Sequence, residues 1–317
     1  MTTLTSAPVL EFESVSRVWR AGILGGSAEV TALTDCSFTL GRGETLAVTG
    51  GAGAGKSTLL LLAAAHAVST GGSIRWSGVH DPTLTRPQII GARPWEYNFL
   101  TVRQALAFHA DQLAAHDASV ARTTRFVPLM RDVGLRGMAR VRLGALSAID
   151  QLRVVVAQAL LAEPRLICID EPLGFCGPRE RILAAALLRD LTARGIALLL
   201  AARDGAQLAS LGLAPRTLRL EAGRVLGHEV LTHRVIDLAV PRVDEALTRL
   251  SSRLPSLRRR GRRLRVPLGG TTPEAVLAAC RAAGVRVRGS RVAEEPLPPP
   301  EESPPPRPLL PEEPPRP

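Results

Sequence analysis

The sequence predicts an α/β protein whose core is a mainly parallel β-sheet. Several short apolar runs are each followed by a turn signal, which is the pattern of buried parallel strands. They cover residues 45–50, 166–170 and 196–202. Helical patterns separate these runs, at residues 56–67, 149–161 and 178–194. Strands that alternate with helices in this way favour a parallel sheet covered by helices.

Two further segments flank this core. Residues 9–40 alternate in the manner of antiparallel strands, which predicts an N-terminal antiparallel β subdomain. Beyond about residue 227 the pattern changes to a strand-like stretch at 262–268, a helical stretch at 273–284 and a strand-like stretch at 285–292. This order predicts a small, separate β-α-β unit at the C-terminal side.

The last 22 residues, 296–317, contain 12 prolines with glutamate and arginine between them. Such a segment cannot bury apolar surface, so we expect it to be disordered or to form polyproline II. The sequence therefore predicts three parts: a core domain at 8–227, a small C-terminal α/β accessory domain at 228–292 and a disordered Pro-rich tail at 293–317.

The net charge of +11 and the pI near 11.1 favour anionic partners. Six arginines lie close together: Arg258, Arg259, Arg260, Arg262, Arg263 and Arg265. A solvated basic loop or strand edge, a contact with anionic lipid and nucleic-acid binding are all compatible with this run. The four cysteines fit neither a zinc site nor a disulfide framework, so we expect reduced, buried thiols. No apolar run approaches the roughly 18 to 20 residues that span a bilayer, so we expect any role at a membrane to be peripheral.

The stretch GGAGAGKSTLL, at residues 50–60, contains the only lysine of the chain, Lys56. It fits the pattern G-x-x-x-x-G-K-[ST], follows an apolar strand and opens a helix, which is the setting of a P-loop. Glycines let backbone N–H groups curl around a β-phosphate, and the positive end of the helix faces the anion. A slim ammonium group can reach the β- and γ-phosphates where a planar guanidinium cannot. We predict that ATP contacts Gly50, Gly51, Ala52, Gly53, Ala54, Gly55, Lys56, Ser57 and Thr58.

The stretch LICIDEP, at residues 166–172, supplies a second part of the predicted site. An apolar strand that ends in Asp170 can place this carboxylate beside Mg²⁺, with Ser57 as a second metal ligand. Glu171 then lies where a general base could polarise the attacking water, and we predict Glu171 and Lys56 as the catalytic residues. The alternative is an acidic pair that caps a helix. A guanine-specific GTPase is excluded because its base-reading motif needs a second lysine.

From about residue 9 to residue 227 the chain resembles the nucleotide-binding subunits of ABC transporters. FESVSRVW, at 12–19, resembles the aromatic loop of the family, in which Trp19 would stack on adenine. GGSIRWSG, at 71–78, resembles the strand pair that follows the P-loop helix. LTVRQALAF, at 100–108, resembles the start of the helical subdomain, and residues 146–172 resemble the block from the signature motif to the Walker B strand.

The resemblance implies an ATP hydrolase that binds Mg-ATP and forms a homodimer, or a heterodimer with another ATP-binding subunit. It would drive a separate membrane permease from the cytoplasmic face of the cell membrane. The region after residue 227 resembles the C-terminal extension of drug and polysaccharide-type export ATPases, which favours an exporter. We do not expect nucleic acid as a partner. A nucleotide-switched regulator without transport, and a soluble ABC protein that acts on nucleic acid or ribosomes, remain as alternatives.

Four family positions depart from the usual pattern. The signature LSGGQ reads Leu-Ser-Ala-Ile-Asp at 146–150, where Ser147 and Asp150 also resemble a capping box for the following helix. Trp95 stands at the Q-loop position, Gly177 at the D-loop position and Arg203 at the H-loop position. Arg203 could contact the γ-phosphate, or it could simply face solvent. We therefore predict ATP binding with hydrolysis that is weak or dependent on a partner.

Overall fold

The computed structural model describes most of the chain. The described residues are 7–21, 28–91, 98–116, 126–174, 176–203, 216–230, 232–251, 257–268 and 272–296, with short pieces at 205, 208, 211–213 and 253–254. They divide into two compact units. The first unit comprises described residues within 1–203 and 217–228, and the second those within 204–216 and 229–301. The predicted start of the Pro-rich tail at residue 293 is wrong, because residues 293–296 pair as a strand with residues 232–235. The rest of the predicted tail, from residue 297 onward, lies outside the described residues.

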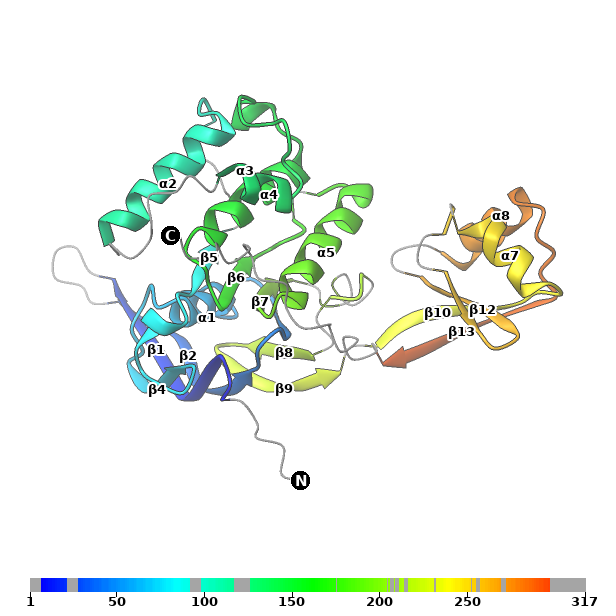
Figure 1. The fold of residues 1–317 in the computed structure, drawn as a ribbon. Coiled ribbons are helices and arrows are strands. Elements are labelled where there is room, and N and C mark those ends of the chain that lie inside the picture. Colours follow the sequence, from blue (N-terminus) through cyan, green and yellow to red (C-terminus); the bar gives the residue numbers. More distant parts are fainter. Residues whose placement is uncertain are drawn as a thin grey trace, which may run out of the picture. The chain divides into compact units, whose positions relative to one another are not determined.

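A six-stranded sheet forms the core of the first unit, in the order β5-β6-β7-β3-β8-β9 (Figure 1). Parallel pairs join β5 to β6, β6 to β7, and β7 to β3. The strands span Gln88–Ile90 (β5), Leu166–Asp170 (β6), Ala197–Ala202 (β7), Thr45–Thr49 (β3), Arg216–Glu221 (β8) and Arg224–Val230 (β9). The three predicted parallel strands are confirmed, and every residue of β3 and β7 is buried.

A three-stranded antiparallel sheet, in the order β2-β1-β4, supports one side of this core (Figure 1). Its strands are β1 (Leu10–Ala21), β2 (Ala28–Leu40) and β4 (Gly71–Trp76), so the predicted N-terminal β subdomain is confirmed. The prediction of a strand pair at 71–78 is wrong, because this segment contains a single strand. After β4 the chain turns through Ser77 and Gly78, both with positive φ, and only the single bridge between Trp76 and Val79 follows.

Helix α1 (Lys56–Ala63) lies between the two sheets of the first unit. It ends four residues before the predicted helix because Ala65 adopts a left-handed backbone with φ 59°. The remaining helices of the unit are α2 (Val102–His116), α3 (Phe126–Asp132), α4 (Ala148–Leu160) and α5 (Pro178–Ala193), with short 3₁₀ turns η1 (Pro82–Leu84) and η2 (Leu143–Ala145). Among the described helices of the chain, none has the length and apolarity required to cross a membrane.

The second unit contains a four-stranded antiparallel sheet with the order β11-β12-β10-β13 (Figure 1). Its elements are β10 (Thr232–Ala239), α7 (Val243–Leu250), β11 (Arg258–Arg260), β12 (Arg263–Pro267), α8 (Pro273–Ala282) and β13 (Gly289–Pro296). The unit is larger than the predicted β-α-β arrangement. Its core joins Ile236 and Leu238 of β10 to buried side chains of α7 and α8. All four cysteines of the chain are free and buried, as predicted.

Candidate functional site

The loop between β3 and α1, at residues 50–55, has a backbone that only glycine tolerates at its two ends. Gly50 has φ 153° and Gly55 has φ 103°. A Cβ atom added at Gly50 would collide with the carbonyl oxygen of Leu220, and one at Gly55 with the carbonyl oxygen of Ala32. The middle of the loop, 51–53, is exposed. The neighbouring strands therefore fix the ends of the loop and leave its centre facing solvent.

The ammonium group of Lys56 lies over this loop. Its Nζ donates hydrogen bonds to the carbonyl oxygens of Gly50, at 2.7 Å, and Gly51, at 2.8 Å. Lys56 is the first residue of α1, so the ammonium charge and the unpaired N–H groups of the helix start are at the same place. This combination of a cation, exposed loop backbone and a helix N-terminus is suited to a polyphosphate.

The structure brings Ser57 and Asp170 together, although 113 positions separate them in the sequence. The Ser57 hydroxyl donates a hydrogen bond of 2.8 Å to Oδ2 of Asp170. Ser57 is the second residue of α1 and Asp170 is the last residue of β6, so the contact joins the phosphate loop to the carboxyl end of the sheet. A hydroxyl and a carboxylate are oxygen ligands that suit Mg²⁺, which usually takes its remaining ligands from phosphate and water.

Glu171 follows β6 in a left-handed backbone conformation, with φ 50°. Its N–H donates to the carbonyl oxygen of Ala201 on β7, at 2.9 Å, which fixes this turn. The Glu171 carboxylate lies 3.5 Å from Nε of Arg203, just past the end of β7. The Arg203 side chain is 83% exposed, so water screens this ion pair. The residue predicted as general base and the residue at the H-loop position therefore face each other.

Trp19, on β1, is tied to the phosphate helix. Its indole N–H donates to the hydroxyl of Thr58, at 3.2 Å. The guanidinium carbon of Arg17 lies 4.1 Å from the centre of the indole ring and covers one of its faces. Only the other face of the Trp19 ring can stack on a base, so adenine could approach this ring from one side. Arg17 was not identified from the sequence, because a register shift between Arg17 and Val18 changes the simple alternation of β1.

A comparison with protein-family models matches residues 33–174 to the model described as ABC transporter. This range contains the phosphate loop, Ser57, Asp170 and Glu171. The matched segment is similar to an ABC transporter ATP-binding cassette, and the first unit, which contains this segment, is called the cassette below.

Individual relatives agree with this assignment of the cassette. The chain is 28% identical over 272 residues to a probable syringafactin export ATP-binding/permease protein of Pseudomonas syringae pv. syringae (strain B728a), covering 83% of this chain and 39% of the relative. It is 29% identical over 191 residues to an aliphatic sulfonates import ATP-binding protein of Burkholderia lata, covering 60% and 65% respectively. A solved ATP-binding subunit of an ABC transporter superposes with a TM-score of 0.54 at 26% identity, covering 70% of this chain and 90% of that one. The chain thus spans less than two thirds of either curated relative.

The residues predicted to stand at the signature position, 146–150, lie at the start of α4. Ser147 is the N-cap: its hydroxyl accepts the N–H of Asp150 at 3.2 Å and donates to the Asp150 carboxylate at 2.7 Å. Asp150 also pairs with Arg153 at 2.7 Å. The capping contact expected from the sequence is therefore present, and Ile149 is buried with 5% exposure. These side chains close the first turn of α4 with groups of the same chain.

Glu180 of the cassette connects two helix starts and was not identified from the sequence. Its Oε2 accepts the N–H of Gly177, the N-cap of α5, at 2.9 Å. Its Oε1 accepts the N–H of Ile149 in the first turn of α4, at 3.4 Å. Gly177, predicted to stand at the D-loop position, is thus the N-cap residue of α5. Trp95, at the Q-loop position, lies outside the described residues.

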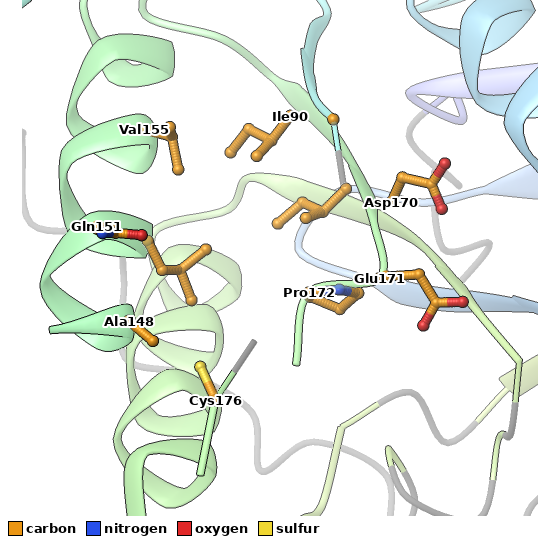
Figure 2. Close-up of a pocket in the computed structure, with 11 residues that line it drawn as sticks. Ile90, Ala148, Gln151, Val155, Asp170, Glu171, Pro172 and Cys176 are labelled. Carbon is orange, nitrogen blue, oxygen red and sulfur yellow. The ribbon is translucent and has the colours of Figure 1, made fainter. Parts of the chain in front are cut away.

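A small pocket of about 30 Å³ lies between the cassette helix α4 and the end of β6 (Figure 2). Ala148, Gln151 and Val155 of α4 line one side. Figure 2 shows the carboxylates of Asp170 and Glu171 pointing away from α4. The pocket has room for about one water molecule, so it is not the nucleotide site.

Proposed function

We propose that this chain is the ATP-binding subunit of an ABC transporter of the exporter type, which binds Mg-ATP and drives a separate membrane permease. The contact between Ser57 and Asp170 carries the proposal, because it joins the phosphate loop to the carboxylate at the end of β6. Lys56 would leave the carbonyl groups of Gly50 and Gly51 to bind the β- and γ-phosphates of ATP. The exposed backbone of residues 51–53 would surround the β-phosphate.

Ser57 and Asp170 would hold Mg²⁺ together with phosphate oxygens and water. When bound, the metal neutralises charge that develops on the transferred phosphoryl group. Glu171 would orient the attacking water and accept its proton. Its position just beyond Asp170, in a turn fixed by the bond to Ala201, supports this role. Trp19 would offer the ring face that Arg17 does not cover to the adenine base.

Hydrolysis would be weak, or would depend on a partner. Ile149 and Asp150 add a branched side chain and a negative charge at the start of α4, where the usual signature has glycine and glutamine. The N–H groups of this first turn already bind Ser147 and Glu180, which leaves less capacity for a γ-phosphate. Arg203, at the H-loop position, contacts the Glu171 carboxylate and would compete with the attacking water for this group. A partner with an intact signature would then supply the groups that complete the Walker site of this chain.

The partners we propose are a membrane permease and a second ATP-binding subunit, identical or different. The cassette would act at the cytoplasmic face of the cell membrane as a peripheral subunit. The longest of the matches described above is to an export protein, and the C-terminal unit resembles the extension of export ATPases, which together favour export. A regulator that uses ATP as a switch is the second candidate, because the start of α4 is closed by groups of the chain itself.

Binding of labelled ATP to the purified full chain tests the proposal. The Lys56→Ala variant should lose binding, whereas Glu171→Gln should retain it. Arg103→Ala, which removes an exposed cation on α2, is the matched control and should bind as the wild type does. No binding by the wild type at millimolar ATP would refute the nucleotide site.

A second assay tests transport and catalytic impairment. The tagged chain is recovered from membranes with and without ATP, and the ATPase activity of the recovered complex is measured. Recovery with a polytopic membrane protein supports the transporter, whereas recovery without one supports the regulator. Turnover by the chain alone at the rate of ordinary transport ATPases would refute impaired hydrolysis.

A further inference from the structure

The arginine run of the second unit is sorted by strand alternation onto the two faces of its sheet. In β12, Leu264 and Val266 are buried in the core, whereas Arg263 is exposed and Arg265 is half-buried. Since successive side chains of a strand point to opposite faces, the arginines of β12 lie on the face away from the core. The core side of the sheet carries α7 and α8, as Figure 1 shows.

The strand register extends this pattern across the whole sheet, because directly paired residues in antiparallel strands share a face. Asp237 of β10 pairs with Arg265 on one side and with Arg291 of β13 on the other, and Arg265 pairs with Arg258 of β11. In the next row Arg263 pairs with Arg260. We call this set the arginine face; it consists of Arg258, Arg260, Arg263, Arg265 and Arg291.

Charge balance distinguishes this face from the opposite one. Arg259 points to the opposite face and is neutralised by Asp244 of α7, at 2.6 Å. On the arginine face the paired rows contain one carboxylate, Asp237, which Arg265 binds through two hydrogen bonds of 2.7 and 2.6 Å. This contact, together with nearby Arg260 and Arg263, lowers the pKa of Asp237. These paired rows therefore contain five arginines and one carboxylate, so their formal charge is strongly positive.

The arginine face covers only one end of the sheet along the strand direction. Arg258, Arg260, Arg263 and Arg291 are exposed, whereas Val235, one row beyond Asp237, is fully buried. The arginine face therefore occupies the end of the sheet near Ala239.

The chemistry of the unit favours a membrane surface over nucleic acid. Residues 229–296 contain no phenylalanine, tyrosine or tryptophan, the side chains on which single-stranded bases stack most strongly. Of the described helices, α7 and α8 pack on the opposite face, so neither of them could enter a major groove while the arginine face meets DNA. Several guanidinium groups on one sheet face instead match a surface that carries many phosphates, each of which arginine can bind with two hydrogen bonds.

We propose that the arginine face binds the anionic phospholipid headgroups of a membrane surface. The choice of a membrane as partner rests on the proposed function, whereas the basic face rests on the strand register and exposure alone. The contact would add an electrostatic attachment to the membrane that needs neither nucleotide nor permease.

Vesicle binding by the purified full chain tests this proposal. Vesicles of phosphatidylcholine alone, and of an equimolar mixture with phosphatidylglycerol, are sedimented with the protein at low and high salt. Attraction to an anionic leaflet changes affinity about fivefold per basic residue, so Arg258→Gln/Arg260→Gln/Arg291→Gln should bind the mixed vesicles about 100-fold more weakly. The matched control, Arg253→Gln/Arg281→Gln/Arg286→Gln, removes three exposed arginines elsewhere in the same unit and should keep most of the binding.

Several outcomes would overturn the proposal. They are equal losses in both triple variants, binding that does not depend on phosphatidylglycerol, and complete displacement by millimolar inorganic phosphate, which would indicate a single anion site. Binding of duplex DNA with the same variant dependence, but not of vesicles, would assign the face to nucleic acid. Thermal unfolding of each variant controls for folding. Binding of labelled ATP is measured in parallel, so that a failed nucleotide site and a failed lipid face are distinguished.

Discussion

A graded series of alanine substitutions in the phosphate loop tests how the fold holds the loop. At Gly51 an added Cβ meets nothing within 4 Å, so Gly51→Ala should change the free energy of unfolding by no more than about 0.5 kcal/mol. Gly53 has equally open surroundings but a φ of 75°, which should cost an alanine about 1 kcal/mol. Gly55 combines a φ of 103° with a collision against the Ala32 carbonyl and contact with the buried Leu33.

The expected cost at Gly55 is therefore the largest of the series. Backbone strain of about 1–2 kcal/mol adds to a displacement of β2, and the total should reach about 3 kcal/mol or more. Denaturant unfolding followed by tryptophan fluorescence isolates this effect, because the three tryptophans, at positions 19, 76 and 95, all precede the second unit. The reasoning would be refuted if Gly55→Ala unfolded at the same denaturant concentration as Gly51→Ala.

Other substitutions test separate contacts. Ser147→Ala removes the N-cap of α4 and should destabilise the cassette by about 1 kcal/mol in the same fluorescence assay; no change would mean that the cap is dispensable. Ser57→Ala should reduce the gain in ATP affinity that Mg²⁺ provides by about tenfold or more, measured by titration with and without the metal. Asp237→Asn should lower the stability of the second unit by about 2 kcal/mol at neutral pH, measured by calorimetry. Since the pKa of Asp237 is lower when folded, its stabilisation is present above the unfolded pKa of about 4 and is lost as the pH falls through the folded value, so the difference from the wild type should shrink in acid.

Contacts that depend on local sequence were predictable. The apolar run at 166–170 coincides with β6, and the G-x-x-x-x-G-K-S motif coincides with the loop and the start of α1. One contact between distant segments, that of Ser57 with Asp170, was also predictable, because the motifs around these residues each supply a ligand of the same Mg²⁺ ion. The cap of α4 by Ser147 followed from a spacing of three residues.

Other contacts between distant segments were not predictable, because no sequence motif marks their residues. Glu180 reaches Ile149 across 31 positions, and nothing in the spacing of these residues indicates that α4 and α5 begin side by side. The prediction for the second unit was too small because it left out β10, α7 and β11, and the core that these elements share with β12 and α8 joins segments that are distant in the sequence. The strand pair expected at 71–78 came from a family resemblance, and positive φ at Ser77 and Gly78 ends the chain's single strand there.

The alternation of arginine and aliphatic residues in β12 also constrains how this sheet can assemble. A slip of one residue in its pairing with β10 would drive guanidinium groups into the interior and bring Leu264 and Val266 into water. The energetic penalty for both errors is large, so a misaligned pairing of these two strands cannot compete with the native one. The same side chains that make the surface basic therefore also select the correct strand register while the polypeptide folds.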